Sequence, residues 1–156
     1  MYTVAFGDKN LIISIPDELD HGFNEKGNLL VFKENIEYLN LWIGTVSAIT
    51  SGENAGLNAI IDNMSKSAKA KGVQLHLENK QLPWYSHESN GEYERIPLKV
   101  TQWLVGFWYA PTAYTIIMTL SIYAKDISQP FSIRMQEEWI MPMIKSININ
   151  PETINA

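Results

Sequence analysis

The densest group of titratable side chains lies early in the chain, where Asp17, Asp20 and His21 follow a proline. A carboxylate beside a histidine is the raw material of general acid–base catalysis, so a small hydrolase that uses these three side chains is one hypothesis. Acidic residues are also common in the solvated turn that follows a strand-ending proline, and Glu18 fits that interpretation. We therefore expect a turn here and keep the hydrolase as an alternative.

The other residues capable of chemistry form no catalytic or metal-binding pattern. The three histidines, His21, His76 and His87, never occur at the spacing that places two metal ligands on one helix face. His76 and Glu78 share a strand face, which is more typical of an exposed polar surface than of a metal site. The chain has no cysteine, no G-x-S-x-G elbow, no phosphate-binding glycine loop and no dinucleotide fingerprint. We expect no metal, no cofactor and no enzymatic activity.

Composition is typical of a single globular domain. The chain has 156 residues, of which 46% are hydrophobic, and a formal charge of −5 from 17 acidic and 12 basic side chains. A protein that binds nucleic acid needs a basic footprint, so this charge argues against such a partner. Residues 1–8 show no cationic region followed by an apolar run, so we expect no secretory signal and a cytoplasmic location.

The uncharged stretch from Trp103 to Ala124 is long enough for a membrane-spanning helix. Its middle contains Pro111, which would break a helix but suits a turn, and its residues are largely β-branched and aromatic. From Tyr114 onward, apolar residues alternate with a largely polar set. The stretch therefore predicts two core strands joined by a turn, with one apolar face and one half-polar face, rather than a membrane anchor.

These two strands belong to a larger pattern of strands and helices. We expect further strands at residues 2–6, 11–15, 30–32, 39–49 and 73–77, and a helix from Ser51 to Gly72. The polar segment 81–94 indicates either a strand continuation or a long hairpin connection. A second helix begins at Pro130 and should be kinked or ended by Pro142. The order predicts an antiparallel sheet with two main helices packed on it, in one α+β domain over residues 1–148 followed by a C-terminal tail over 149–156.

Two large aromatic residues, Trp84 and Tyr85, interrupt the hydrophilic segment 81–94. Tryptophan and tyrosine are favoured anchors of protein interfaces, because each combines a large apolar face with a polar tip at low entropy cost. The alternative is that Trp84 caps the edge of the sheet or the end of the core. If acidic neighbours ring the pair, binding is favoured, and the candidate site comprises Trp84, Tyr85, His87, Glu88, Glu92 and Glu94. A second candidate surface is the half-polar strand face, with Thr119, Tyr123 and, from a neighbouring strand, Trp42.

Two short motifs resemble the PsbP-like superfamily. Residues 12–17, Ile-Ile-Ser-Ile-Pro-Asp, correspond to an early strand that ends in proline. Residues 139–147, Trp-Ile-Met-Pro-Met-Ile-Lys-Ser-Ile, correspond to a closing helix with a serine near its end. The order of the elements between them is also similar. The resemblance implies a PsbP-like fold and, from its bacterial members, a small non-catalytic protein of contact-dependent or type VI secretion systems.

Those bacterial members include immunity proteins, which neutralise a toxin, and adaptor chaperones, which hold an effector before export. The adaptor branch is expected to carry a more basic, arginine-containing early strand than residues 39–49 provide. The resemblance therefore favours an immunity protein that binds a cognate secreted toxin. The alternative is an effector adaptor, which would bind an apolar export segment and act as a homodimer. No functional residue of the family is carried over, because both motifs are structural.

Overall fold

The computed structural model describes residues 1–33, 40–49, 56–77, 82–123 and 135–154. In chain order the elements are β1 (Tyr2–Phe6), β2 (Leu11–Ile15), β3 (Asp20–Phe23), β4 (Leu29–Phe32), β5 (Asn40–Ile49), α1 (Leu57–Ala70), β6 (Trp84–Tyr93), β7 (Ile96–Tyr109), β8 (Thr112–Tyr123), the π-helical turn η2 (Gln136–Ile140), α3 (Met141–Ser146), β9 (Asn148–Ile149) and α4 (Pro151–Ile154). The expected mixture of helices and antiparallel strands is confirmed, although strands dominate it.

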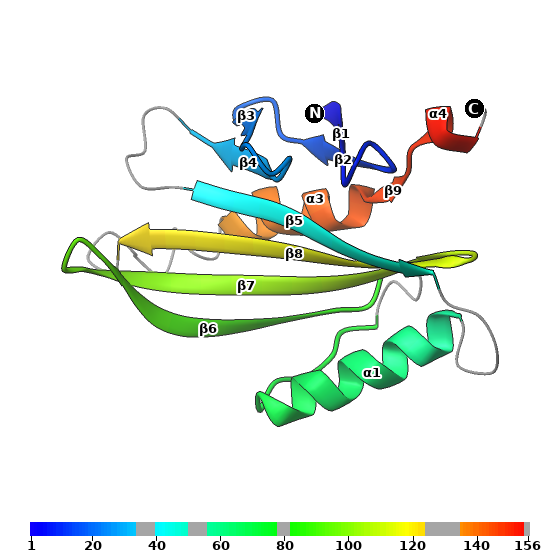
Figure 1. The fold of residues 1–156 in the computed structure, drawn as a ribbon. Coiled ribbons are helices and arrows are strands. Elements are labelled where there is room, and N and C mark those ends of the chain that lie inside the picture. The colour runs from blue at the N-terminus through cyan, green and yellow to red at the C-terminus, as the bar shows by residue number, and fades with distance from the viewer. Residues whose placement is uncertain (34–39, 50–55, 78–81, 124–134, 155–156) are drawn as a thin grey trace.

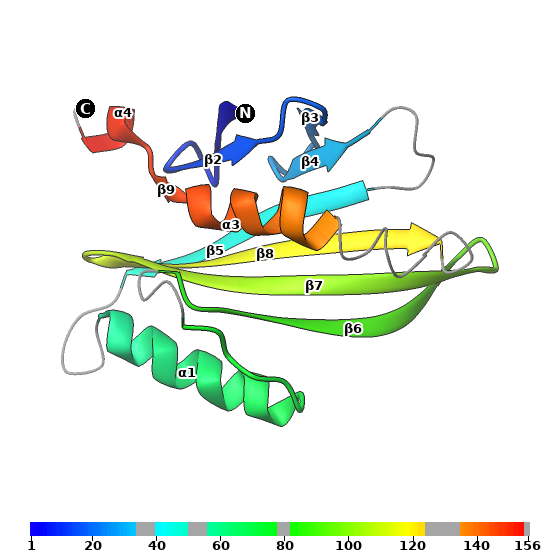
Figure 2. The same cartoon turned by 180° about the vertical axis from the view of Figure 1, so that it is seen from behind.

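The strands form two antiparallel sheets. The small sheet has the order β1-β2-β9, and the large sheet has the order β3-β4-β5-β8-β7-β6. The molecule has three layers, in which the small sheet and α3 lie on one face of the large sheet and α1 lies on the other (Figures 1 and 2). Both termini lie on the side of the small sheet (Figure 1).

The main core fills the space between the two sheets and α3. Ile116, Met118 and Leu120 of β8 point into it, together with Ile13 of β2 and Met143 of α3. A second, smaller apolar cluster lies between α1 and the large sheet. The large sheet is therefore covered by protein on parts of both faces.

Strands β7 and β8 confirm the predicted hairpin. They pair from Leu98 opposite Tyr123 to Tyr109 opposite Thr112, and Ala110 and Pro111 make the turn. Within the described residues, no helix is both long and apolar enough to cross a membrane.

Helix α1 confirms the first predicted helix in part. It begins at Leu57, since Ser51 to Ala55 lie outside the described residues, and it ends at Ala70. Gly72 follows with a φ of +71°, in the left-handed region where glycine is favoured after a helix. The predicted glycine stop is thus confirmed.

The structure corrects the prediction for residues 73–77 and decides between the alternatives for residues 81–94. Residues 73–77 form no strand, and only an isolated bridge joins His76 to Trp84. Their alternation has another cause, because Val73 and Leu75 pack against the α1 cluster. Of the two alternatives for the segment 81–94, the strand is the one that the structure has, because residues 84–93 are the edge strand β6.

The C-terminal segment also differs from the prediction. The regular α-helix is interrupted next to Pro142, as the sequence predicts in part: the chain stays helical, but the π-helical turn η2 ends at Ile140 and α3 begins at Met141, so the proline lies in the first turn of α3. Part of the predicted tail is held in place. Ile149 pairs with Leu11, and the Asn150 side chain donates to the carbonyl of Lys9 over 2.7 Å.

Candidate functional site

Trp84 and Tyr85, the predicted anchors, are both buried. Trp84 is 7% exposed and belongs to the main core, and its ring stacks on His76 with the centroids 4.0 Å apart. Tyr85 is 2% exposed and packs under α1 in the second cluster. Burial raises the pKa of the Tyr85 hydroxyl, and a hydrogen bond with Ser67 of α1 opposes that shift. Both rings are therefore already used inside the protein.

Alternation along β6 separates the acidic residues from the histidine of the predicted site. Glu88 and Glu92 lie on the face of Trp84, whereas His87 lies on the face of Tyr85. Glu94 lies in the β6–β7 turn with a φ of +49°. All three glutamates are exposed, but they do not form a ring around the aromatic pair.

Four residues from four adjacent strands stand in one row across the large sheet. Trp42 of β5 lies opposite Thr119 of β8, Thr119 lies opposite Gln102 of β7, and Gln102 lies opposite His87 of β6. Directly opposed residues of antiparallel strands share one face of the sheet. We call these four residues the cross-strand row. Tyr123, at the end of β8, lies opposite Leu98, but its side chain is outside the described part of the structure.

Gln102 joins the polar members of the row. Its Nε2 donates to Thr119 Oγ1 over 3.2 Å, and its Oε1 lies 3.0 Å from His87 Nε2. Because an amide oxygen only accepts, His87 Nε2 is the donor of that bond. Each side chain is thus held by its neighbour. Gln102 was missed in the sequence because it lies just before the uncharged stretch that begins at Trp103 and has no distinctive spacing.

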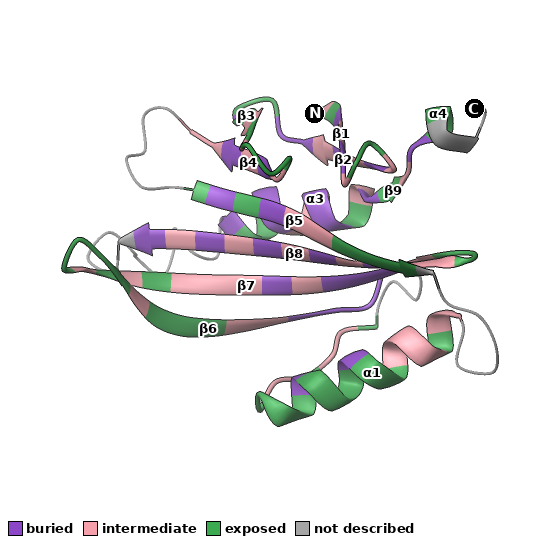
Figure 3. Cartoon of the chain, viewed as in Figure 1, coloured by how far each residue is buried: buried purple, intermediate pink, exposed green. Residues whose placement is uncertain are grey.

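Helix α1 covers only one end of this face of the large sheet. It lies close to the sheet at Gly106, where an added Cβ would lie 2.6 Å from Ile60 Cγ2 and 2.7 Å from Met64 Sδ. At the cross-strand row, Trp42 is 37% exposed and its three polar members are half-buried. Figure 3 shows α1 under one end of the sheet and exposed or half-buried stretches of β6 and β7 beyond it. Among the described elements, none covers the row.

The acidic group near the N-terminus is arranged differently from a catalytic site. Asp20 and His21 are consecutive in β3, so their side chains leave opposite faces of the strand. His21 Nδ1 lies 3.1 Å from the Tyr2 hydroxyl, and the Asp17 carboxylate lies 2.9 Å from the amino group of Met1. Among the described residues, no hydrogen bond or ion pair joins any two of Asp17, Asp20 and His21. Glu18 instead accepts a hydrogen bond of 2.6 Å from the Trp139 indole.

No group of three or more histidine or carboxylate side chains that could hold a metal ion occurs in the described ranges. His76, which shares an expected strand face with Glu78, stacks on Trp84 instead, and Glu78 lies outside those ranges.

Comparison with known proteins relates the chain to others by fold. No family model and no curated protein matches it. Among solved structures, a protein of Bacteroides thetaiotaomicron is similar over 97% of this chain, with a TM-score of 0.59 and 12% identity. The chain spans only 49% of that protein. LpqN of Mycobacterium tuberculosis, involved in cell envelope biogenesis, is similar over 96% of this chain and 90% of its own length, with a TM-score of 0.52 and 8% identity. At these identities the likeness is a distant relation of fold alone.

Proposed function

We propose that this protein is a non-catalytic binding domain. A partner protein would bind at the end of the large sheet that α1 leaves uncovered, which we call the open end. The observation that supports this proposal is the cross-strand row, in which an exposed tryptophan stands beside three polar side chains that hold one another in place. An aromatic anchor next to ordered polar groups is the usual composition of an interface centre. Side chains that are fixed in advance lose less entropy when a partner binds.

The chemistry of this surface favours a folded partner. Trp42 would enter an apolar pocket, and the polar members of the row would pair with polar groups of the partner. The formal charge of −5 would speed association with a basic protein through long-range attraction. An export segment held by an adaptor would instead need a continuous apolar groove, so the polar members of the row favour an immunity protein over the adaptor.

In its specific form, the proposal is that the partner is a secreted toxin and that binding neutralises it. The PsbP-like resemblance supports this form, because immunity proteins are among the bacterial members of that superfamily. A cytoplasmic location belongs to the same proposal. Cell fractionation, with an antibody against the present protein, tests this location. Because LpqN is involved in cell envelope biogenesis, the envelope fraction should be analysed as well as the cytoplasmic one.

The test begins with capture of the partner from the protein's own cells and its identification by mass spectrometry. Isothermal titration then compares the wild-type protein with two variants. Trp42→Ala should weaken the complex by more than about 1 kcal/mol, which is roughly fivefold in Kd. Tyr109→Ala is the matched control, because Tyr109 is 43% exposed and lies on the opposite face of the large sheet. Circular dichroism checks that both variants fold.

Two outcomes would contradict the proposal at different levels. Equal affinity of wild-type protein and a folded Trp42→Ala variant would exclude this surface. For the immunity role, the captured partner is expressed in cells with and without this protein. If the partner is not toxic, or if co-expression of a tightly bound complex fails to restore growth, the immunity role is wrong even though binding stands.

A further inference from the structure

Strand β6 is one edge of the large sheet, and half of its residues turn their backbone groups away from β7. The Gly106 amide donates to the Pro83 carbonyl over 2.9 Å, so Pro83 is turned toward β7. Trp84 is turned the other way, because it exchanges two hydrogen bonds, of 2.7 and 3.1 Å, with His76. This orientation alternates along an antiparallel pair. The residues after Trp84 that face away from β7 are therefore Ser86, Glu88, Asn90 and Glu92.

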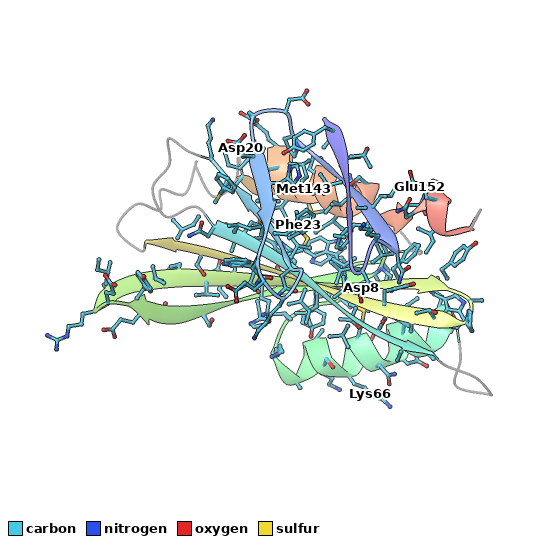
Figure 4. All side chains as sticks on the ribbon, turned by 45° about the horizontal axis from the view of Figure 1, so that its top comes forward. Asp8, Asp20, Phe23, Lys66, Met143 and Glu152 are labelled. Atoms are coloured by element: carbon cyan, nitrogen blue, oxygen red, sulfur yellow. The ribbon has the colours of Figure 1, made fainter. Side chains whose placement is uncertain are left out.

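These four residues form a free strand edge, which we call the β6 edge. Among the described residues, only His76 pairs with β6 on this side, and it does so at Trp84. From residue 86 to residue 92 the edge is about 24 Å long, and its N–H and C=O groups can pair with another extended chain. Figures 1 and 4 show the β6–β7 hairpin projecting beyond α1, the helix that carries the labelled Lys66.

The side chains along the β6 edge complement themselves in one antiparallel register. When two copies pair about a two-fold axis at Ser89, Glu88 lies opposite Asn90 of the second copy, and Ser86 lies opposite Glu92. All four residues of the edge are then paired, and each carboxylate faces a neutral side chain that can donate a hydrogen bond. If the axis moved by one residue in either direction, two glutamates would lie opposite each other, which is destabilising.

The remaining charges make this pairing sensitive to salt. Glutamates of the two copies still approach each other diagonally, at about 7–8 Å. Lys99 of β7 lies opposite Asn90 and shares its face, so it offsets part of this repulsion. Each copy also carries a formal charge of −5. Salt screens such repulsion, and paired copies should therefore bind more tightly at high ionic strength.

The two ends of the paired strands are complementary as well. In the same register, Tyr93 of the second copy comes level with Tyr85, on the face of the sheet where α1 packs. Tyr93 is 58% exposed, and a hollow of about 510 Å³ opens on that face between α1 and the segment that follows it. The residues that line this hollow include Lys69, Leu75 and Leu77. The tyrosine ring of one copy can therefore cover apolar surface of the other.

We propose that the protein forms a homodimer in which two β6 edges pair antiparallel about Ser89 and join both large sheets into one. Backbone hydrogen bonds supply most of the contact, and Tyr93 in the hollow of the other copy supplies the rest. Such a contact is at the small end of interface sizes, so we expect a Kd of about 10 µM. The inference does not rest on the proposed function. His87 comes opposite Gly91, which has no side chain, so the cross-strand row stays open and Trp42→Ala should leave the dimer unchanged.

Sedimentation velocity measures the dimer over a series from about 1 to 200 µM protein. Asn90→Pro should weaken it by about tenfold or more, because proline removes an N–H that faces away from β7 and leaves the β6–β7 bonds in place. Asn90→Ala keeps this N–H and is the matched control, with a change of less than about threefold. Tyr93→Ser should weaken the dimer about fivefold. Tyr109→Ser is its control, since Tyr109 is 43% exposed at the other end of β7.

Disulfide trapping identifies the register, since the chain has no cysteine of its own. The Cα atoms of the two Ser89 residues would lie about 4.5 Å apart at the axis, within the range of a disulfide. Ser89→Cys should therefore give a covalent dimer under mild oxidation. The two Asn90 residues are offset by two positions, about 8 Å apart, so Asn90→Cys should remain largely uncrosslinked.

Several results would overturn the dimer. They are a wild-type protein that stays monomeric throughout the series, equal dimerisation of Asn90→Pro and Asn90→Ala, and an Asn90→Cys variant that crosslinks as well as Ser89→Cys. Circular dichroism checks the fold of each variant, and if Asn90→Pro does not fold, the two cysteine variants decide. A dimer that Trp42→Ala dissociates would place the second copy on the cross-strand row, and pairing through β6 would then be wrong.

Discussion

Gly106 should be essential for the docking of α1 on the large sheet. A Cβ at this position would lie 2.6 Å from Ile60 Cγ2 and 2.7 Å from Met64 Sδ. Carbon atoms in contact prefer about 3.5–4.0 Å, so the helix must retreat by about 1 Å or the side chains must leave their rotamers. The methionine sulfur can move, but Cγ2 of a β-branched residue is fixed close to the helix backbone. Overpacking of this kind lowers the free energy of unfolding by about 1–3 kcal/mol. Alanine offsets about 0.5–1 kcal/mol of this loss, because it is more stable than glycine inside a strand.

We therefore expect Gly106→Ala to lower the free energy of unfolding by about 1–2 kcal/mol, or Tm by about 5 °C. Urea titration followed by tryptophan fluorescence measures it. Gly22→Ala is the control, because Gly22 lies in β3 and a Cβ there meets nothing within 4 Å. Combining Gly106→Ala with Ile60→Ala removes the clash, so the double variant should be at least about 1 kcal/mol more stable than the sum of the single effects predicts. Strict additivity, or a Gly106→Ala variant as stable as the wild-type protein, would refute this account.

Three further predictions concern single contacts. In urea titration, Trp139→Phe should lower the free energy of unfolding by about 1 kcal/mol more than Trp103→Phe does. The Trp139 indole donates to Glu18, whereas the buried Trp103 indole N–H has no partner among the described residues. Asn150→Ala should lower stability by about 1–2 kcal/mol and speed proteolysis after residue 147, because its amide bonds the β1–β2 turn and accepts from the Glu152 amide. The raised pKa of Tyr85 implies that the unfolded chain ionises near pH 10 while the folded protein keeps the proton. The stability that this pKa difference contributes is fully present below pH 10 and is lost as pH rises through the folded pKa. In urea titration, the free energy of unfolding should therefore fall less between pH 8 and pH 11 for Tyr85→Phe than for the wild-type protein.

The β7–β8 hairpin could be predicted from the sequence because its signal is local. One face of β8 is buried along its whole described length, so every second residue from Tyr114 to Ile122 is apolar. Proline at the turn resolved the remaining ambiguity between strands and a membrane helix. Where burial follows the strand period, periodicity is sufficient.

Strand β6 could not be recognised in the same way, because it is an edge strand with little burial. Only its first two residues, Trp84 and Tyr85, are buried, and they point to opposite faces. The rest is half-buried or exposed and shows no alternation of apolar and polar types. Conversely, Val73 and Leu75 alternate although they form no strand, because both pack under α1. The alternation of apolar residues in a sequence therefore indicates which side chains are buried. It indicates only indirectly whether the backbone pairs as a strand.

The cross-strand row was predicted in pieces. Trp42, Thr119 and His87 were each named as candidates, but on two separate surfaces. Their alignment depends on the register between strands far apart in the chain, which no local pattern specifies. Gln102 completes the row and had no sequence signal of its own.

The open end of the large sheet follows from the lengths of its elements. Helix α1 has 14 residues and is about 21 Å long, whereas β7, also with 14 residues, extends about 46 Å. Even if α1 lay parallel to the strands, it could cover less than half of β7. It packs at Gly106, and Gln102 lies four residues away along β7, about 13 Å beyond. Covering the cross-strand row therefore requires a second layer that no described element supplies, and the proposed partner would do there what α1 does at the other end.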